Sequence, residues 1–117
     1  MTDHSTLLSK LKQAMKQFVE ERDWTAYHHP KELAIALSIE CNELLELFLF
    51  KTQNLVEILE DKDLMQSISE EIADILAYLL SIVNTLNLDL TTIYMKKMHK
   101  NRQKYPISEF KGNFKKK

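Results

Sequence analysis

The chain has 117 residues, of which 44% are hydrophobic and 28% charged, an ordinary composition for one globular domain. Its one cysteine, Cys41, excludes an internal disulfide and suits a reducing compartment. No apolar run reaches the roughly 18 residues of a membrane span, and the first residues lack the apolar core of a signal peptide. We therefore expect a cytoplasmic protein.

The net charge is −1, but the charges are unevenly distributed. Residues 1–94 carry 16 acids and 7 bases, whereas residues 95–117 carry 9 bases and 1 acid. Such a basic segment indicates either a polyanionic partner or a segment that folds back toward an acidic centre. We expect one domain over residues 1–110, followed by a basic, flexible tail over 111–117 that ends in the run Lys115–Lys117.

Residues that break helices are rare in this chain, and this predicts an all-α fold. There is one glycine and there are two prolines, Pro30 and Pro106, so nothing of this kind interrupts residues 31–105. Pro30 is suited to the first position of a helix, and Asp89 to an N-cap. The polar stretch at residues 51–63 predicts a turn that can include a short helix. The four main helices of a bundle-like fold are expected over about residues 6–21, 30–50, 64–86 and 90–104.

The second and third of these helices each carry two acids near the side that should be buried. At 100° per residue, Glu40 falls within the apolar arc of the second helix and Glu43 falls on its edge. In the third helix Glu71 borders the apolar arc, and Asp74 lies one turn further along. Acids three residues apart share one face, so each helix presents an acid pair close to its apolar side.

Carboxylates near a core are costly unless something compensates their charge, and neighbouring ones raise one another's pKa. A hard divalent cation resolves this conflict, and carboxylate oxygens suit Mg²⁺, which often takes phosphate oxygens as further ligands. A di-iron bundle is the rival metal site, but it needs Glu-x-x-His on two helices, and no histidine here follows a glutamate at that spacing. The other alternative is that both acid pairs are ordinary solvated features.

Five short blocks occur in order between residues 18 and 106. They are "ERDW", "HHP", "ECNELLELF", "EEIADILAYLL" and "KMHKNRQKYP", and 27 residues separate Glu43 from Glu71. Together these blocks resemble the all-α nucleoside triphosphate pyrophosphohydrolases, the MazG-like and dUTPase-like superfamily, and within it the dCTP pyrophosphatase branch. The chain has no glycine-rich phosphate loop and no supported Ser/His/Asp arrangement, which agrees with this resemblance.

The resemblance implies a MazG-type fold and an enzyme that cleaves a nucleoside triphosphate between its α and β phosphates. The expected cofactor is Mg²⁺, with Mn²⁺ as a substitute, and the nucleophile is a metal-activated water. The expected substrate is dCTP or a base-modified dCTP, and the implied role is house-cleaning of the nucleotide pool. The metal ligands and catalytic residues that it implies are Glu40, Glu43, Glu71 and Asp74.

The resemblance also implies contacts to the triphosphate or sugar from the fourth helix. Lys97, Asn101 and Tyr105 lie at i, i+4 and i+8, on one stripe of that helix, and Arg102 lies near it. Lysine and arginine are suitable partners for phosphate. An ordinary solvated basic helix is the alternative.

The base pocket is expected to be lined by aromatic residues, again by resemblance. Trp24 lies in a polar loop, and Phe50 and Tyr78 lie seven residues after Glu43 and Glu71. Core packing is the alternative for these aromatics. His28 is expected either to hydrogen-bond a base or phosphate or to serve at the helix entry. The dCTP branch often has tryptophan at the position of Phe50 and histidine at that of Met15, which leaves the base preference open.

The third helix is apolar over much of its circumference, more than a four-helix monomer of this size can cover, so we expect a homo-oligomer. The resemblance implies a dimer or a dimer-of-dimers tetramer in which a neighbouring subunit completes the base pocket. The expected partners are therefore a nucleoside triphosphate and further copies of the chain, without a membrane or a nucleic acid polymer. The alternatives are a nucleotide-binding regulatory module with little turnover and a helical interaction protein.

Overall fold

The structure, a computed structural model, describes residues 1–114, and in this range it contains helices and loops but no strand. This confirms the predicted all-α class. The chain separates into two compact units, Met1–Asn87 and a second unit that begins at Leu88. The expectation of a single domain over residues 1–110 stays a prediction. The run Lys115–Lys117, expected to be a flexible end, lies outside the described residues.

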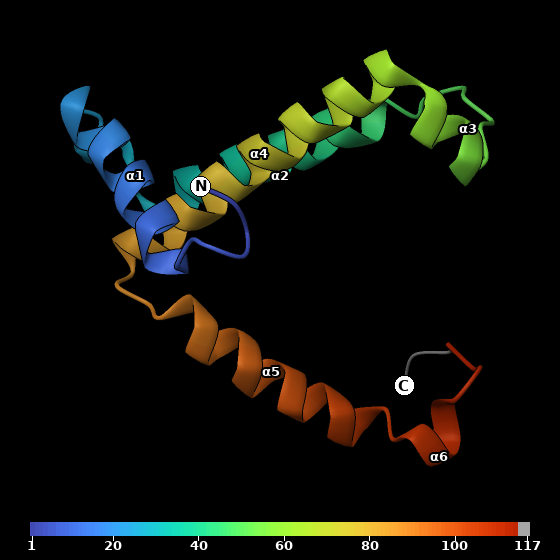
Figure 1. The fold of residues 1–117 in the computed structure, drawn as a ribbon. Coiled ribbons are helices and arrows are strands. Elements are labelled where there is room, and N and C mark those ends of the chain that lie inside the picture. The colour runs from blue at the N-terminus through green and yellow to red at the C-terminus, as the bar shows by residue number, and fades with distance from the viewer. Residues whose placement is uncertain (115–117) are drawn as a thin grey trace. The chain divides into compact units, whose positions relative to one another are not determined.

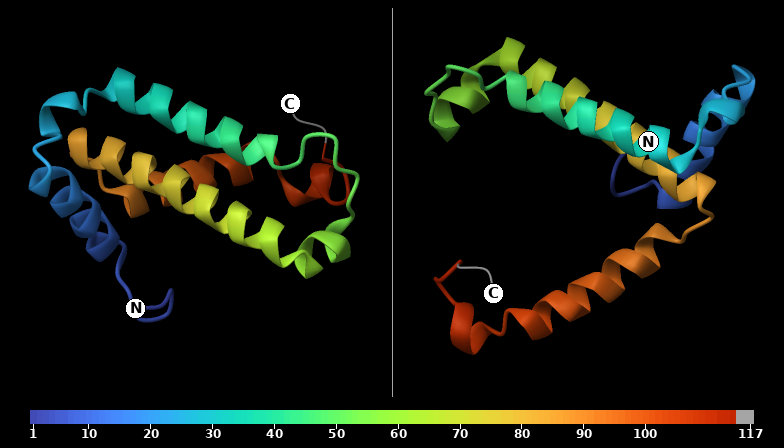
Figure 2. Two further views of the ribbon diagram at one scale, coloured as in Figure 1. Left: turned by 90° about the horizontal axis from the view of Figure 1, so that it is seen from above. Right: turned by 180° about the vertical axis from the view of Figure 1, so that it is seen from behind.

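Two long antiparallel helices form the centre of the first unit, α2 (Pro30–Glu46) and α4 (Lys62–Thr85) (Figure 1). They lie side by side in both views of Figure 2. α1 (Leu8–Glu21) packs against α4 near its C-terminal end, and the short α3 (Leu55–Glu60) packs against α4 near its start. The buried apolar side chains at the core of this unit are Val19, Leu33, Leu64, Leu80 and Val83.

α2 begins at Pro30 as predicted, but it ends earlier than expected. His29 is its N-cap, with Nδ1 accepting a hydrogen bond from the backbone N–H of Lys31 at 3.1 Å. The helix ends at Glu46, so the prediction that it continues to Phe50 is wrong. Tight turns with hydrogen bonds three residues back follow it, and Phe50 has φ 60°. The apolar run before Phe50 contains no breaking residue, so the sequence offered no signal for this end.

The start of α4 is set by side-chain caps in the polar stretch, where α3 confirms the expected short helix. Asn54 and Glu57 form a complete capping box for α3. Asp61 Oδ1 then accepts from the Leu64 N–H at 3.0 Å, and Oδ2 accepts from Gln53 Nε2 at 3.0 Å. These hydrogen bonds lower the pKa of Asp61 below its usual value, and the bond from the Leu64 N–H has the larger effect. This cap starts α4 at Lys62, two residues before the expected position.

The second unit contains α5 (Leu90–Lys104) and the short α6 (Ile107–Phe110). Asp89 caps α5 as predicted, with its carboxylate accepting from the Thr92 N–H at 3.1 Å. The rings of Tyr105 and Phe110 meet edge to face at 5.0 Å between centroids. Among residues 1–114, no single helix is both long and apolar enough to cross a membrane, although α4 and α5 together meet those criteria by length and composition.

Burial predicts which leucines carry the stability of the first unit. Leu33, on α2, is 3% exposed, whereas Leu7, at the N-cap of α1, is 71% exposed. Leu33→Ala is expected to lower the free energy of unfolding by about 2–5 kcal/mol, because it leaves a cavity in the core. Leu7→Ala, the matched control, is expected to change it by about 0.5 kcal/mol. Urea denaturation followed by circular dichroism measures both, and equal losses would contradict the assignment of Leu33 to the core.

Candidate functional site

The pairing of α2 with α4 brings three of the four expected acids together. Glu40, Glu43 and Glu71 each contribute one carboxylate oxygen, and these oxygens all lie within 4.8 Å of one another. Glu40 and Glu71 are half-buried and Glu43 is exposed. Asp74 is exposed and stands outside this close set. We call Glu40, Glu43 and Glu71 the acid cluster.

The acid cluster is electrostatically strained at neutral pH. The pKa of Glu40 is raised to about 7, mainly by burial. Hydrogen bonding to Glu43, the charge of Glu43 and the charge of Asp74 contribute in that order. Burial and the nearby Glu43 also raise the pKa of Glu71. The charge of Asp74 therefore acts on both half-buried acids, although Asp74 is not part of the cluster. Without a counter-charge, these groups resist ionising together.

Two oxygens of the acid cluster have no hydrogen-bond donor. Oε2 of Glu40 and Oε2 of Glu71 are buried, and no group within residues 1–114 donates a hydrogen bond to either. The two ion pairs seen in that range, Lys16–Glu20 and Arg22–Glu21, lie elsewhere, at α1. Buried acceptors are normally satisfied, and clustered carboxylate oxygens are the ligands that Mg²⁺ and similar hard cations prefer. The residues present therefore fit a divalent metal ion.

A cavity of about 580 Å³ lies between the loop that follows α1, the first half of α2 and the middle of α4. Its volume falls within the range of small-molecule sites. Its wall contains three residues that the sequence predicted to contact the substrate: Trp24, His28 and Tyr78. The wall also contains Tyr27 and Glu32, which were not predicted from the sequence although they lie one residue before and two residues after the "HHP" block. We call this space the large cavity.

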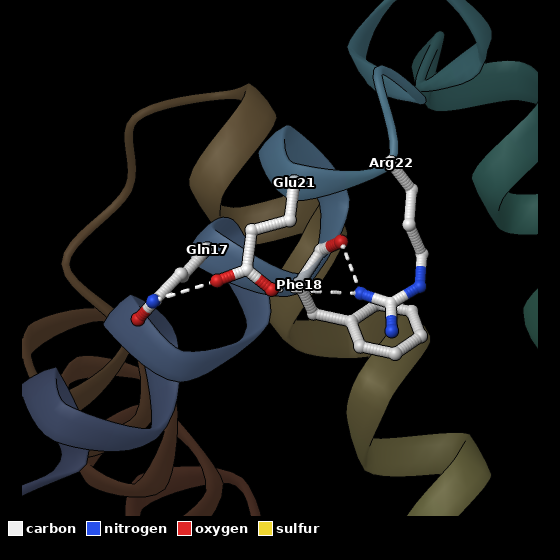
Figure 3. Close-up of polar contacts among 4 residues, drawn as sticks. All are labelled: Gln17, Phe18, Glu21 and Arg22. Carbon is white, nitrogen blue, oxygen red and sulfur yellow. Dashed lines mark hydrogen bonds and ion pairs between the residues drawn. The ribbon is translucent and has the colours of Figure 1, made fainter.

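A series of contacts at the end of α1 positions Trp24. Arg22 Nη1 donates to the Phe18 carbonyl at 3.0 Å, and the guanidinium carbon lies 3.8 Å from the centre of the Phe18 ring. Glu21 lies 3.7 Å from Arg22 and accepts from Gln17 Nε2 at 2.8 Å (Figure 3). The other neighbour of the Phe18 ring is Trp24, which it meets edge to face at 5.8 Å. The indole is thus supported from α1 at the wall of the large cavity.

His28 is half-buried beside this wall, and burial lowers its pKa below the usual value. The imidazole is therefore neutral at pH 7 and offers one donor and one acceptor. Phe50, in contrast, is 96% exposed and does not line the large cavity. Because α2 ends at Glu46, the seven-residue spacing from Glu43 to Phe50 does not place these two residues on one helix face.

The remaining expected substrate residues all belong to the second unit, at Lys97, Asn101, Arg102 and Tyr105. Within that unit Asn101 Nδ2 lies 3.9 Å from Met98 Sδ, and Tyr105 packs against Phe110. The basic residues Arg102 and Lys104 occupy the last turn of α5, where their positive charges interact favourably with the negative end of the helix dipole. Their role toward a substrate stays a prediction.

The chain is similar in sequence to known proteins of one family. The model of the MazG-like family matches residues 35–117. The dCTP pyrophosphatase 1 of Mus musculus is 33% identical over 108 residues, which are 91% of this chain and 63% of that protein. The Homo sapiens dCTP pyrophosphatase 1 is 33% identical over 101 residues, 85% of this chain and 59% of that protein. The chain thus spans less than two thirds of the length of these curated relatives.

A solved structure extends the likeness to three dimensions. The crystal structure of a pyrophosphatase from Archaeoglobus fulgidus is 36% identical, covers 91% of this chain and 98% of its own, and superposes with a TM-score of 0.77. The family relationship expected from the five sequence blocks is thereby confirmed. By its sequence and by its fold, the chain belongs to the MazG-like family.

Proposed function

We propose that this chain is a Mg²⁺-dependent nucleoside triphosphate pyrophosphohydrolase that converts a deoxynucleoside triphosphate to the monophosphate and pyrophosphate. The observation that carries this proposal is the acid cluster, with three carboxylate oxygens within 4.8 Å and two orphaned buried oxygens. The names of the relatives, dCTP pyrophosphatase 1, support dCTP or a base-modified dCTP as the substrate.

The acids would hold the ion between α2 and α4, with Glu40, Glu43 and Glu71 as direct ligands and Asp74 beside them. When bound, Mg²⁺ supplies positive charge to the phosphate oxygens and lowers the pKa of a coordinated water. Mn²⁺ has similar ligand preferences and is expected to substitute for it. Glu40 and Glu71 are the half-buried members of the cluster, so they would hold the side of the ion that faces away from solvent.

The reaction needs a proton acceptor for the attacking water. Glu43 is the exposed member of the acid cluster and is suited to this role, because it meets solvent and the other two acids at once. The water oxygen forms a bond to one phosphorus of the α–β linkage, and Glu43 takes the water proton. The bond from that phosphorus to the bridging oxygen breaks, and the bridging oxygen leaves with the electron pair.

The large cavity would hold the base, one to two turns from the acid cluster along the same two helices. Trp24 and Tyr78 supply flat surfaces, and neutral His28 supplies a hydrogen-bond donor or acceptor. Lys97, Asn101, Arg102 and Tyr105 are proposed to contact the triphosphate or sugar, for which the positive charge of Lys97 and Arg102 is suitable. The implied role is removal of unwanted nucleotides from the cytoplasmic pool, and the lone thiol of Cys41 suits that reducing compartment.

We also propose a homo-oligomer, a dimer or a dimer-of-dimers tetramer. Large apolar side chains are exposed along α2 and the turns after it, and on α4: Ile35, Ile39, Leu45, Leu49, Phe50 and Ile72. Phe50 combines 96% exposure with a left-handed backbone, an unfavourable combination for an aromatic residue on a free surface. A second copy would cover these side chains and complete the base pocket.

Pyrophosphate release tests the activity most simply. The wild-type protein is expected to release pyrophosphate from dCTP in Mg²⁺ and not in excess chelator. Glu40→Gln is expected to lower kcat/KM by about 100-fold or more, because it removes a charged ligand without changing shape. Glu46→Gln, an exposed acid at the end of the same helix, is the matched control and should retain activity. Full turnover by Glu40→Gln would rule out the ligand assignment, and no release from any triphosphate by folded wild-type protein would favour the regulatory module.

The raised pKa of Glu40 predicts a pH-dependent stability. Between its usual pKa of 4.5 and the folded value of about 7, the folded state binds more protons than the unfolded state. The stability of the metal-free protein therefore falls as pH rises through this window. Glu40→Gln removes the effect, so the Tm of this variant should exceed that of the wild type by a margin that grows from pH 5 to pH 8. Thermal melts in chelator measure the margin.

Added Mg²⁺ should reverse this trend in the wild type, because the ion binds the ionised acids of the folded state only. We expect a larger rise in Tm with Mg²⁺ at pH 8 than at pH 6, and little rise in Glu40→Gln. A difference in Tm between Glu40→Gln and wild type that shrinks as pH rises would contradict the assignment of Glu40 as a metal ligand. An equal rise in Tm with Mg²⁺ in both proteins would contradict it as well.

Oligomerisation is tested by sedimentation velocity. The wild type should sediment with a mass that is a multiple of the 13.8 kDa chain, and its Tm should rise with protein concentration. Phe50→Asp should shift the distribution toward the single chain, because a charge is costly in a covered apolar surface. A single 13.8 kDa species at every concentration, with a concentration-independent Tm, would refute the oligomer.

A further inference from the structure

Glu32 is the one acidic residue that lines the large cavity within residues 1–114. The other lining residues are aromatic, apolar or histidine, and in the same described range no lysine or arginine is among them. This wall therefore lacks the side chains that usually bind phosphate. A nucleotide that enters the large cavity is expected to place its base there, and its phosphates near the acid cluster and its cation.

Glu32 projects from the side of α2 that leads to the acid cluster. Ala36, which also lines the large cavity, lies four residues after Glu32, and Glu43 lies seven residues after Ala36. In a regular helix these three positions fall within about 40° of one another. On α4, Tyr78 of the cavity wall lies seven residues after Glu71, about 20° around the helix. The large cavity and the acid cluster therefore lie on the same side of both helices.

The carboxylate of Glu32 is unpaired in the part of the chain that the structure describes. The residue is exposed, and no hydrogen bond or ion pair engages its side chain there. An ionised carboxylate only accepts hydrogen bonds. The partner that Glu32 would bind in the large cavity is therefore a donor, such as an N–H group.

His29 adds a hydrogen-bond donor to the same wall. As the N-cap of α2, its Nδ1 accepts from the Lys31 N–H at 3.1 Å. Nδ1 therefore carries no proton, and the ring proton is on Nε2. His29 and Glu32 both line the large cavity at the start of α2. This end of the wall thus offers an acceptor and a donor.

We propose that Glu32 is a specificity-determining residue, whose carboxylate accepts a hydrogen bond from the exocyclic amino group of a cytosine base in the large cavity. This role rests on the proposed function, since the base must occupy that cavity. Cytosine presents its amino group to a glutamate as a donor, whereas thymine has a carbonyl oxygen at the same place, as does uracil. Two acceptors that face each other repel, so the carbonyl bases are disfavoured. The ring nitrogen of cytosine next to the amino group is an acceptor, which suits the Nε2–H of His29.

Two pairs of triphosphates isolate the amino group: dCTP with dUTP, and 5-methyl-dCTP with dTTP. The members of each pair differ only at this edge of the base, and the wild type is expected to prefer the amino member by kcat/KM. Glu32→Gln keeps the shape and removes the charge. It is expected to lower that preference by about 10- to 100-fold, as for one hydrogen bond to a charged group. The new amide can donate to a carbonyl, so kcat/KM for dUTP and dTTP should not fall.

Asp63→Asn is the matched control for this variant. Asp63 is likewise an exposed acid in the first turn of a long helix, α4, and it does not line the large cavity. Both variants lose a favourable charge at a helix N-terminus, but only Glu32→Gln should change the preference within each pair. An equal change in kcat/KM for all four triphosphates in Glu32→Gln, or no change, would overturn the proposal and leave the activity intact.

Binding of the monophosphates in chelator separates this role from the proposed activity. Trp24 is the only tryptophan of the chain and lines the large cavity, so quenching of its fluorescence reports dCMP or dUMP there without turnover. Tighter binding of dCMP than of dUMP by the wild type, lost in Glu32→Gln, would support the role of Glu32 even if no triphosphate were hydrolysed. Equal affinity of the wild type for both would overturn it. So would binding of neither at millimolar concentration, because the base would then not occupy the large cavity.

Discussion

The repulsion among carboxylates at the contact of α2 with α4 is the constraint on which the rest of the structure depends. Two helices that pack along their apolar sides bring Glu40 and Glu71 into partial burial, with Glu43 completing the acid cluster. The raised pKa of Glu40 and the two orphaned oxygens show that this packing is unfavourable for the acids themselves. A fold that stores such strain at one place gains most from a cation there, because binding relieves repulsion as well as forming bonds.

The surrounding elements keep the two helices in register so that the acids meet. His29 begins α2 and Asp61 begins α4, and each uses its side chain to cap the helix. At the other end of α4, Asn84 binds the backbone of α1, and the Phe18–Trp24 contact carries α1 to the large cavity. The acid cluster and the large cavity therefore share one scaffold, so the proposed metal site and the proposed base pocket would lie at a constant separation.

Periodicity was sufficient to predict that acids of α2 and α4 meet, although Asp74, expected beside them, stands outside the acid cluster. Glu40, Glu43 and Glu71 could be placed on facing sides because 100° per residue holds throughout α2 and α4. Phe50 could not, since the sequence before it carries no signal for the end of α2 at Glu46. Tyr27 and Glu32 were also missed, because only tertiary packing brings the loop after α1 and the first half of α2 to one cavity. The family relationship followed from the ordered sequence blocks, whereas the large cavity required the structure.

The most direct test of the central claim is Mn²⁺ binding to metal-free protein, followed by electron paramagnetic resonance at pH 8. We predict saturable binding that Mg²⁺ displaces, and its loss in a Glu40→Gln, Glu71→Gln double variant that keeps the helical circular dichroism spectrum. This result would show that the acid cluster holds a divalent cation, whatever the substrate. Free Mn²⁺ throughout a titration of folded wild-type protein, or equal binding by the double variant, would contradict the account at its foundation.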